Sequence, residues 1–125
     1  MSGWVLSIAG DPDGVAYVGN HNGVITCWER GTRHWLAESR RSMVIDLALH
    51  PDESRLAALH SNGMIDILDT ADGLVVATLG PIAGEPASVA ITPDGRTLIA
   101  HAVDGRHRAW TTRTPARTVV IEPRP

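Results

Sequence analysis

Lysine, glutamine and phenylalanine are absent from this chain of 125 residues, so all 11 basic residues are arginines. This bias indicates a bacterial genome rich in GC. Cysteine occurs once, at Cys27, so no disulfide forms within the chain and a reducing cytoplasm is the expected location. No apolar run approaches the roughly 20 residues of a membrane-spanning helix, and no secretory leader stands at the N-terminus. We therefore expect a cytoplasmic protein with no membrane partner.

A strong net charge is also absent. The formal charge of −3 gives no reason to expect a nucleic-acid partner. Hydrophobic residues make up 43% of the chain, which predicts a folded domain rather than a disordered segment. The length is sufficient for one domain with its own core.

What the chain does contain is one turn repeated three times. The copies are Asp11-Pro12-Asp13-Gly14, His50-Pro51-Asp52-Glu53-Ser54 and Thr92-Pro93-Asp94-Gly95. Each copy follows an apolar run, and a second apolar run leads from it to a polar turn at Gly23, Gly63 or Gly105. The prolines are 39 and then 42 residues apart. A period near 40 with several short strands per repeat is typical of β-propeller blades.

Each repeat divides into four predicted strands, because Pro-Asp-Gly and Asn-Gly or Asp-Gly are strong turn signals. The predicted strands lie at roughly 4–9, 15–19, 23–29 and 33–37; 43–49, 55–60, 64–69 and 74–79; and 87–92, 97–102, 106–111 and 116–121. The fold class is therefore all-β, with residues 1–125 as a single domain. Its three four-stranded antiparallel blades are predicted at about 4–38, 43–80 and 87–122.

Two sets of repeat positions stand out. A large apolar residue lies five positions after each turn glycine, at Trp28, Leu68 and Trp110, and we expect each to be buried against a neighbouring blade. One position of the first strand is polar in every repeat, at Ser7, Asp46 and Ser88. If the first strand is innermost, these polar residues line the central channel. Serine in two of the three repeats argues against a catalytic carboxylate at Asp46.

These residues resemble the WD-repeat β-propeller family. The resemblance extends over about residues 4–121 and is clearest in Val89–Leu98, followed by Asp104 and Trp110. The Gly-His dipeptide that opens a WD repeat is missing, and asparagine replaces the family's buried turn aspartate at Asn22 and Asn62. The resemblance implies a protein-interaction scaffold. It also implies that the blades depend more on packing than on the family's hydrogen-bond network.

Catalytic, cofactor and metal sites are not indicated. No serine lies in a Gly-x-Ser-x-Gly turn, and no glycine loop of the phosphate-binding type is present. His21, His60 and His101 lie eight or nine residues after the proline of their repeat. They lack the local spacing of a zinc site and are interpreted as ordinary loop and strand-end residues. We expect a non-enzymatic protein without a cofactor.

Closed propellers have about 4–8 blades, and this chain supplies three. The two uncovered end faces are expected to be apolar. Two copies related by a two-fold axis give six blades, so a homodimer is the expected assembly, with an open helical array as the alternative. The predicted function is a scaffold that binds itself and an unidentified protein partner. Two alternatives remain: a small-ligand or hydrolytic site in the channel, and a propeller fragment of a larger bacterial signalling or defence ATPase.

Overall fold

The computed structural model describes residues 5–38, 42–113 and 120–123, which form three four-stranded antiparallel sheets. Blade 1 consists of β1 (Val5–Gly10), β2 (Val15–Asn20), β3 (Val24–Glu29) and β4 (Thr32–Glu38). Blade 2 consists of β5 (Val44–Leu49), β6 (Arg55–His60), β7 (Ile65–Asp69) and β8 (Val75–Leu79). Blade 3 consists of β9 (Pro86–Ile91), β10 (Thr97–Ala102), β11 (His107–Arg113) and β12 (Val120–Pro123). In every blade the strands pair in chain order.

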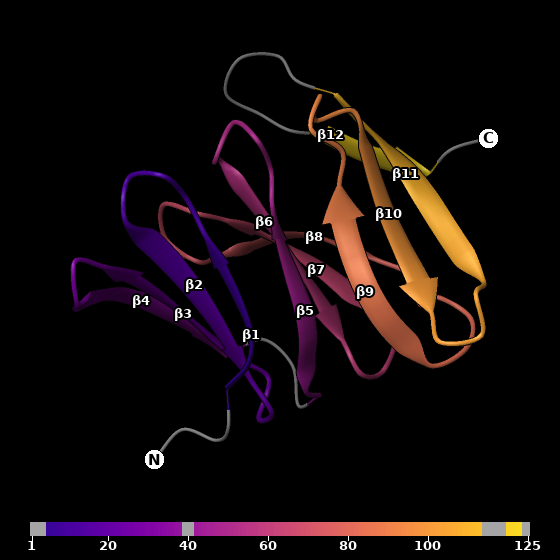
Figure 1. The fold of residues 1–125 in the computed structure, drawn as a ribbon, viewed down its shortest axis with the longest axis horizontal. Coiled ribbons are helices and arrows are strands. Elements are labelled where there is room, and N and C mark those ends of the chain that lie inside the picture. The colour runs from indigo at the N-terminus through magenta and orange to yellow at the C-terminus, as the bar shows by residue number, and fades with distance from the viewer. Residues whose placement is uncertain (1–4, 39–41, 114–119, 124–125) are drawn as a thin grey trace.

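The three blades lie side by side, with blade 2 between the other two (Figure 1). The first strand of each blade lies beside the first strand of the next, β1 by β5 and β5 by β9. This is the all-β, three-blade architecture that the repeats predict. The strand predicted at 116–121 corresponds to β12, and residues 114–119 lie outside the described residues. In the described part of the chain, no helix has the length and apolar character needed to cross a membrane.

The repeated turns are tight because one residue in each adopts a left-handed backbone conformation. Gly14 and Gly95 have φ values of 91° and 73°, and Glu53 occupies the equivalent position with a φ of 68°. Glycine adopts this conformation without steric cost, whereas a residue with a Cβ does not. The turns between the second and third strands use positive-φ glycines at Gly23, Gly63 and Gly105.

The apolar core consists of two clusters, each lying between adjacent blades. The first interface joins blades 1 and 2 through buried Tyr17, Ile25, Cys27, Ala37, Val44, Leu47, Leu56, Ala58 and Leu68. The second interface joins blades 2 and 3 through buried Ala57, Leu59, Ile65, Ile67, Ile82, Val89, Leu98, Ala100 and Trp110. Burying a large aliphatic side chain contributes about 1.5–3 kcal/mol, so these interfaces supply most of the apolar stabilisation.

The three equivalent large residues differ in burial. Leu68 and Trp110 are 0% and 1% exposed, as predicted, because each packs on the preceding blade. Trp28 is 37% exposed, so the prediction that it is buried is wrong for the single chain. The reason is geometric, since among the described residues no blade packs on this side of blade 1.

Blade 2 contains a buried polar network. Asp66 accepts a hydrogen bond from the Thr78 hydroxyl at 3.0 Å, and His60 Nε2 lies 3.2 Å from the other carboxylate oxygen. His60 Nδ1 donates to the Ser42 carbonyl at 3.0 Å. Both His60 and Asp66 are fully buried. His60 Nε2 is nevertheless buried without a hydrogen-bond partner among the described residues, so the network is incomplete, and the expectation that the blades depend more on packing stays a prediction.

Candidate interaction surfaces

Alternate residues along each strand face the blade before and the blade after. In blades 2 and 3, strand register places the residues that face the preceding blade at equivalent positions: Leu47, Leu56, Ala58 and Leu68, and Val89, Leu98, Ala100 and Trp110. All of them are buried. The same register in blade 1 selects Ile8, Ala16, Val18 and Trp28, which no blade covers in the described part of the chain. We call these four residues the leading face.

The leading face is apolar and accessible to solvent. Ile8 is 67% exposed and Trp28 is 37% exposed, while Ala16 and Val18 are half-buried. The Trp28 indole N–H donates to Thr26 Oγ1 at 2.9 Å, which holds the ring along the sheet. An accessible aromatic ring beside aliphatic side chains is typical of a protein-interaction site.

The opposite end of the stack is the side of blade 3 that points away from blade 2. In blade 2 the equivalent positions are Ala57, Leu59, Ile65 and Ile67, all buried in the second interface. In blade 3 they are Ile99, His101, His107 and Ala109, which we call the trailing face. Its two histidines are exposed, and its Ile and Ala are half-buried. The expectation that both end faces are apolar is therefore wrong for this one.

The polar position of the first strand lies at equivalent register in all blades, at Ser7 on β1, Asp46 on β5 and Ser88 on β9. Asp46 Oδ1 accepts a hydrogen bond from the Leu47 amide at 2.9 Å, and Oδ2 accepts one from the Val89 amide at 3.0 Å. The carboxylate thus joins blade 2 to blade 3. This role was not evident from the sequence, and channel lining by these three residues stays a prediction.

Replacing Asp46 with alanine is expected to destabilise the fold by about 1–3 kcal/mol, because the Val89 amide loses its acceptor. Asp46→Ser is the matched control, since it installs the residue found at Ser7 and Ser88. The serine variant should lose less stability than the alanine variant. Urea denaturation of the three proteins measures the difference. Equal stability of wild type and Asp46→Ala would contradict a bridging role.

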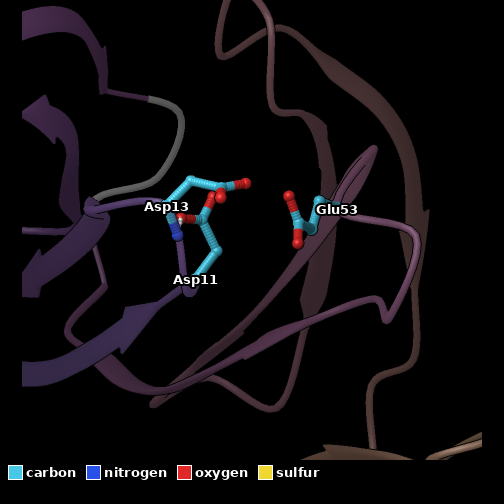
Figure 2. Close-up of side chains that lie close together, drawn as sticks. All are labelled: Asp11, Asp13 and Glu53. Carbon is cyan, nitrogen blue, oxygen red and sulfur yellow. Dashed lines mark hydrogen bonds between the residues drawn. The ribbon is translucent and has the colours of Figure 1, made fainter.

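An acidic cluster lies where the turn of blade 1 meets the turn of blade 2. Ligand oxygens of Asp11, Asp13 and Glu53 lie within 4.8 Å of one another (Figure 2). Partial burial and the carboxylates of Asp11 and Asp13 raise the pKa of Glu53. Within the described ranges no fourth acidic, histidine or cysteine side chain joins the group, whereas calcium takes about 6–8 oxygen ligands. The cluster is therefore a repulsive contact between two turns.

Glu53→Gly is expected to raise the melting temperature by about 2–5 °C. The glycine relieves the left-handed backbone, and the change also removes a carboxylate that its neighbours repel. Glu53→Gln is the control, because it removes only the charge and should give a smaller rise. Thermal melts monitored by circular dichroism measure both effects.

The difference in stability between Glu53→Gln and wild type should depend on pH. Because the pKa of Glu53 is raised in the folded chain, its protonation stabilises the fold at low pH, and this contribution is lost as the pH rises through the raised pKa. The advantage of Glu53→Gln over wild type should therefore shrink as the pH is lowered toward about 4. An advantage that is independent of pH would rule out carboxylate repulsion as its cause.

His21, His60 and His101 do not converge on one site. His60 is equivalent to Asn20 rather than to His21, because the turn of blade 2 is one residue longer than that of blade 1. His60 is buried inside blade 2, whereas His21 is exposed in a turn and His101 lies on the trailing face. Cys27 is also separate from them in the core, where burial raises the pKa of its thiol.

A hollow of about 710 Å³ lies beside blade 3, and its lining includes Ile82, Arg106 and Arg108. The Arg106 guanidinium donates to the Asp104 carboxylate at 2.8 and 2.7 Å, which holds the pKa of Asp104 below its usual range. Arg108 lies 5.0 Å from the ring centroid of Trp110. Both cations are thus engaged within the chain. Asp104 and His107 also line the hollow.

Comparison with known proteins supports the fold. No family model matches the chain, and no curated protein matches its sequence. The crystal structure of the Cps50 (Swd1) β-propeller domain from Myceliophteria thermophila is similar, with a TM-score of 0.78 and 11% identity over 98% of this chain and 38% of that chain. BamB from Moraxella catarrhalis has a TM-score of 0.70 and 19% identity over 87% of this chain and 35% of its own. The chain thus has a β-propeller fold and spans little more than a third of each of these proteins.

Proposed function

We propose that this protein is a non-enzymatic protein-interaction scaffold that closes its ring with a second copy of itself. One observation carries the proposal: the leading and trailing faces occupy the positions that are buried in both internal interfaces. Left uncovered, the leading face keeps Ile8 and Trp28 in water, which is unfavourable for apolar surface. The similarity to chains more than twice as long supports the proposal, because a ring needs more than three blades.

In the proposed ring, the leading face of each copy packs on the trailing face of the other. Ile8 then takes the place that Val89 has in the second interface, and Trp28 takes the place of Trp110. Two such interfaces, related by a two-fold axis, close six blades. Because dimerisation makes both interfaces at once, the assembly should be tight.

Light scattering at micromolar concentration tests the closure. We expect the mass of two chains for wild type, and the mass of one folded chain for Ile8→Glu, because this substitution places a charge on the leading face. A folded wild-type monomer would refute closure and favour a ring completed by other blades. A mass that grows with concentration beyond two chains would indicate the open helical array.

We further propose that a different protein partner binds the faces of the closed ring, as the resemblance to WD-repeat scaffolds suggests. The absence of catalysis is part of the proposal and is supported by Asp46, whose two carboxylate oxygens both accept backbone hydrogen bonds. An enzymatic site in the channel is the competing function. A hydrolase activity lost in Asp46→Ser, with the fold and the mass unchanged, would establish it in place of the scaffold.

A further inference from the structure

Two histidines occupy the centre of the trailing face. His101 on β10 and His107 on β11 are cross-strand partners, and both side chains are exposed. Cross-strand partners have Cβ atoms about 4.5–5.5 Å apart, so the two imidazoles lie next to each other on one face of the sheet. The equivalent pair in blade 2, Leu59 and Ile65, is 0% exposed. Covering the trailing face therefore buries two imidazoles at positions that elsewhere hold aliphatic side chains.

The second interface shows which side chains cover these positions. There the covering blade supplies Val89, Leu98, Ala100 and Trp110. On a second copy the same positions are the leading face, Ile8, Ala16, Val18 and Trp28, together with the neutral Thr26. These five residues include neither a carboxylate to stabilise an imidazolium nor a cation to repel one. The outer strand β4 adds Arg33, opposite Trp28, and Glu38, opposite Val24, on the same side of the sheet. In blade 2 the position equivalent to Arg33, Val75, stays 38% exposed in the first interface, which places the outer strand at the edge of the covered area.

Charged residues of the same blade lie near the pair. Asp104 and Arg106, in the adjoining turn, are paired with each other, and Arg108 lies over Trp110 on the other face of the sheet. The backbone carbonyl of Glu85 accepts a hydrogen bond from the Val103 amide, and the backbone of Glu122 on β12 lies opposite that of Thr111. His101 Nδ1 donates to the Ala102 carbonyl at 3.2 Å. Within the described ranges, neither imidazole has an ion-pair partner.

We infer that ring closure is linked to protons, with the His101–His107 pair as the sensor. The inference rests on the proposed two-copy ring. As neutral rings the imidazoles can be buried beside apolar side chains. As imidazolium ions they repel each other and lose hydration on contact with apolar side chains, and burial disfavours the charged form. Separated copies therefore bind more protons than the ring, so acid drives the copies apart and neutral pH drives them together.

Sedimentation equilibrium over a concentration series tests this at about pH 7.5 and about pH 5.5, a range that spans the ordinary titration of imidazole. For wild type we expect the dissociation constant to rise about tenfold for each buried imidazole between the two pH values. The key variant is His101→Leu combined with His107→Ile, which reproduces Leu59 and Ile65 of blade 2. This variant should dimerise, and its dissociation constant should change less than about threefold between the two pH values.

His34→Leu is the matched control, because His34 is exposed on β4 outside both end faces. It should keep the wild-type pH response. Circular dichroism reports at each pH whether the blades stay folded. If the double variant fails to fold, His107→Ile alone is the alternative. Between the two pH values, the logarithm of its dissociation constant should change about half as much as that of wild type.

The outcomes separate the two proposals. A wild-type dimer with the same dissociation constant at both pH values overturns the proton linkage and leaves the two-copy ring standing. A double variant as pH-sensitive as wild type also overturns it, because other groups would then be responsible. A wild-type protein that is a folded monomer at every pH overturns the ring and the linkage together.

Discussion

Replacing Trp110 with alanine is expected to destabilise the fold by about 3–5 kcal/mol, the usual effect of truncating a buried aromatic residue. Trp110 is 1% exposed in the second interface, where it packs between blades 2 and 3. It also carries the Arg108 guanidinium 5.0 Å above its ring, so the truncation removes a cation–π contact as well. Urea unfolding followed by circular dichroism measures the loss.

Trp28→Ala is the matched control for this experiment. Trp28 occupies the same repeat position, but its ring is on the leading face and remains 37% exposed. In separated chains its truncation should lower stability much less than that of Trp110, while it should weaken association between copies. Equal losses in the two variants at a concentration where the copies are apart would contradict the assignment of Trp28 to an uncovered face.

Asp66→Ala is expected to have an effect of similar size, about 3–5 kcal/mol, because removing one member of a buried pair leaves the other without compensation. The affected group is His60, which is fully buried with Nε2 3.2 Å from the carboxylate. The Thr78 hydroxyl loses its acceptor in the same variant. Thermal or urea unfolding at neutral pH measures the effect.

Two further variants separate the contributions that the Asp66 side chain makes to stability. Thr78→Val removes a single hydrogen bond and should cost about 1 kcal/mol. Asp66→Asn keeps the shape and one acceptor, so it should fall between Thr78→Val and Asp66→Ala. If Asp66→Ala proved as stable as wild type, blade 2 would depend mainly on packing, in line with the expectation from the sequence.

The repeats and their turns were predictable because turn chemistry is local. Pro-Asp-Gly and Asn-Gly fix backbone angles within four residues, and these angles are observed at Gly14, Gly95, Gly23 and Gly63. Glu53 also belongs to this pattern, since alignment with Gly14 and Gly95 places it at the left-handed position. The three blades and nearly all of their strand boundaries follow from these signals.

The candidate surfaces were less predictable because they depend on which neighbours a blade has. Trp28 and Trp110 are alike in sequence, but only one of them has a blade to cover it. The histidines of the trailing face are recognisable only when strand register aligns them with Leu59 and Ile65. The sequence did contain this signal, because His101 and His107 flank the turn at Gly105 symmetrically.

The buried network of blade 2 was missed for a related reason. Asp66 lies within an apolar strand, and its partners come from the ends of two other segments, His60 and Thr78. A hairpin register drawn across the Asn62-Gly63 turn would have placed Asp66 opposite Ala58, with Thr78 on its other side. The role of an aspartate in such a strand is therefore predicted from its cross-strand neighbours as well as from its own strand.

Blade 2 contributes to both interfaces, whereas each end blade contributes to one. A chain of this kind approximates a one-dimensional array, in which an element with one neighbour opens more readily than an element with two. Local opening should therefore be frequent in blades 1 and 3 and rare in blade 2, whose strands β6 and β7 are buried almost throughout. In a closed ring every blade has two neighbours, so assembly would also equalise the resistance of the three blades to local unfolding and proteolysis.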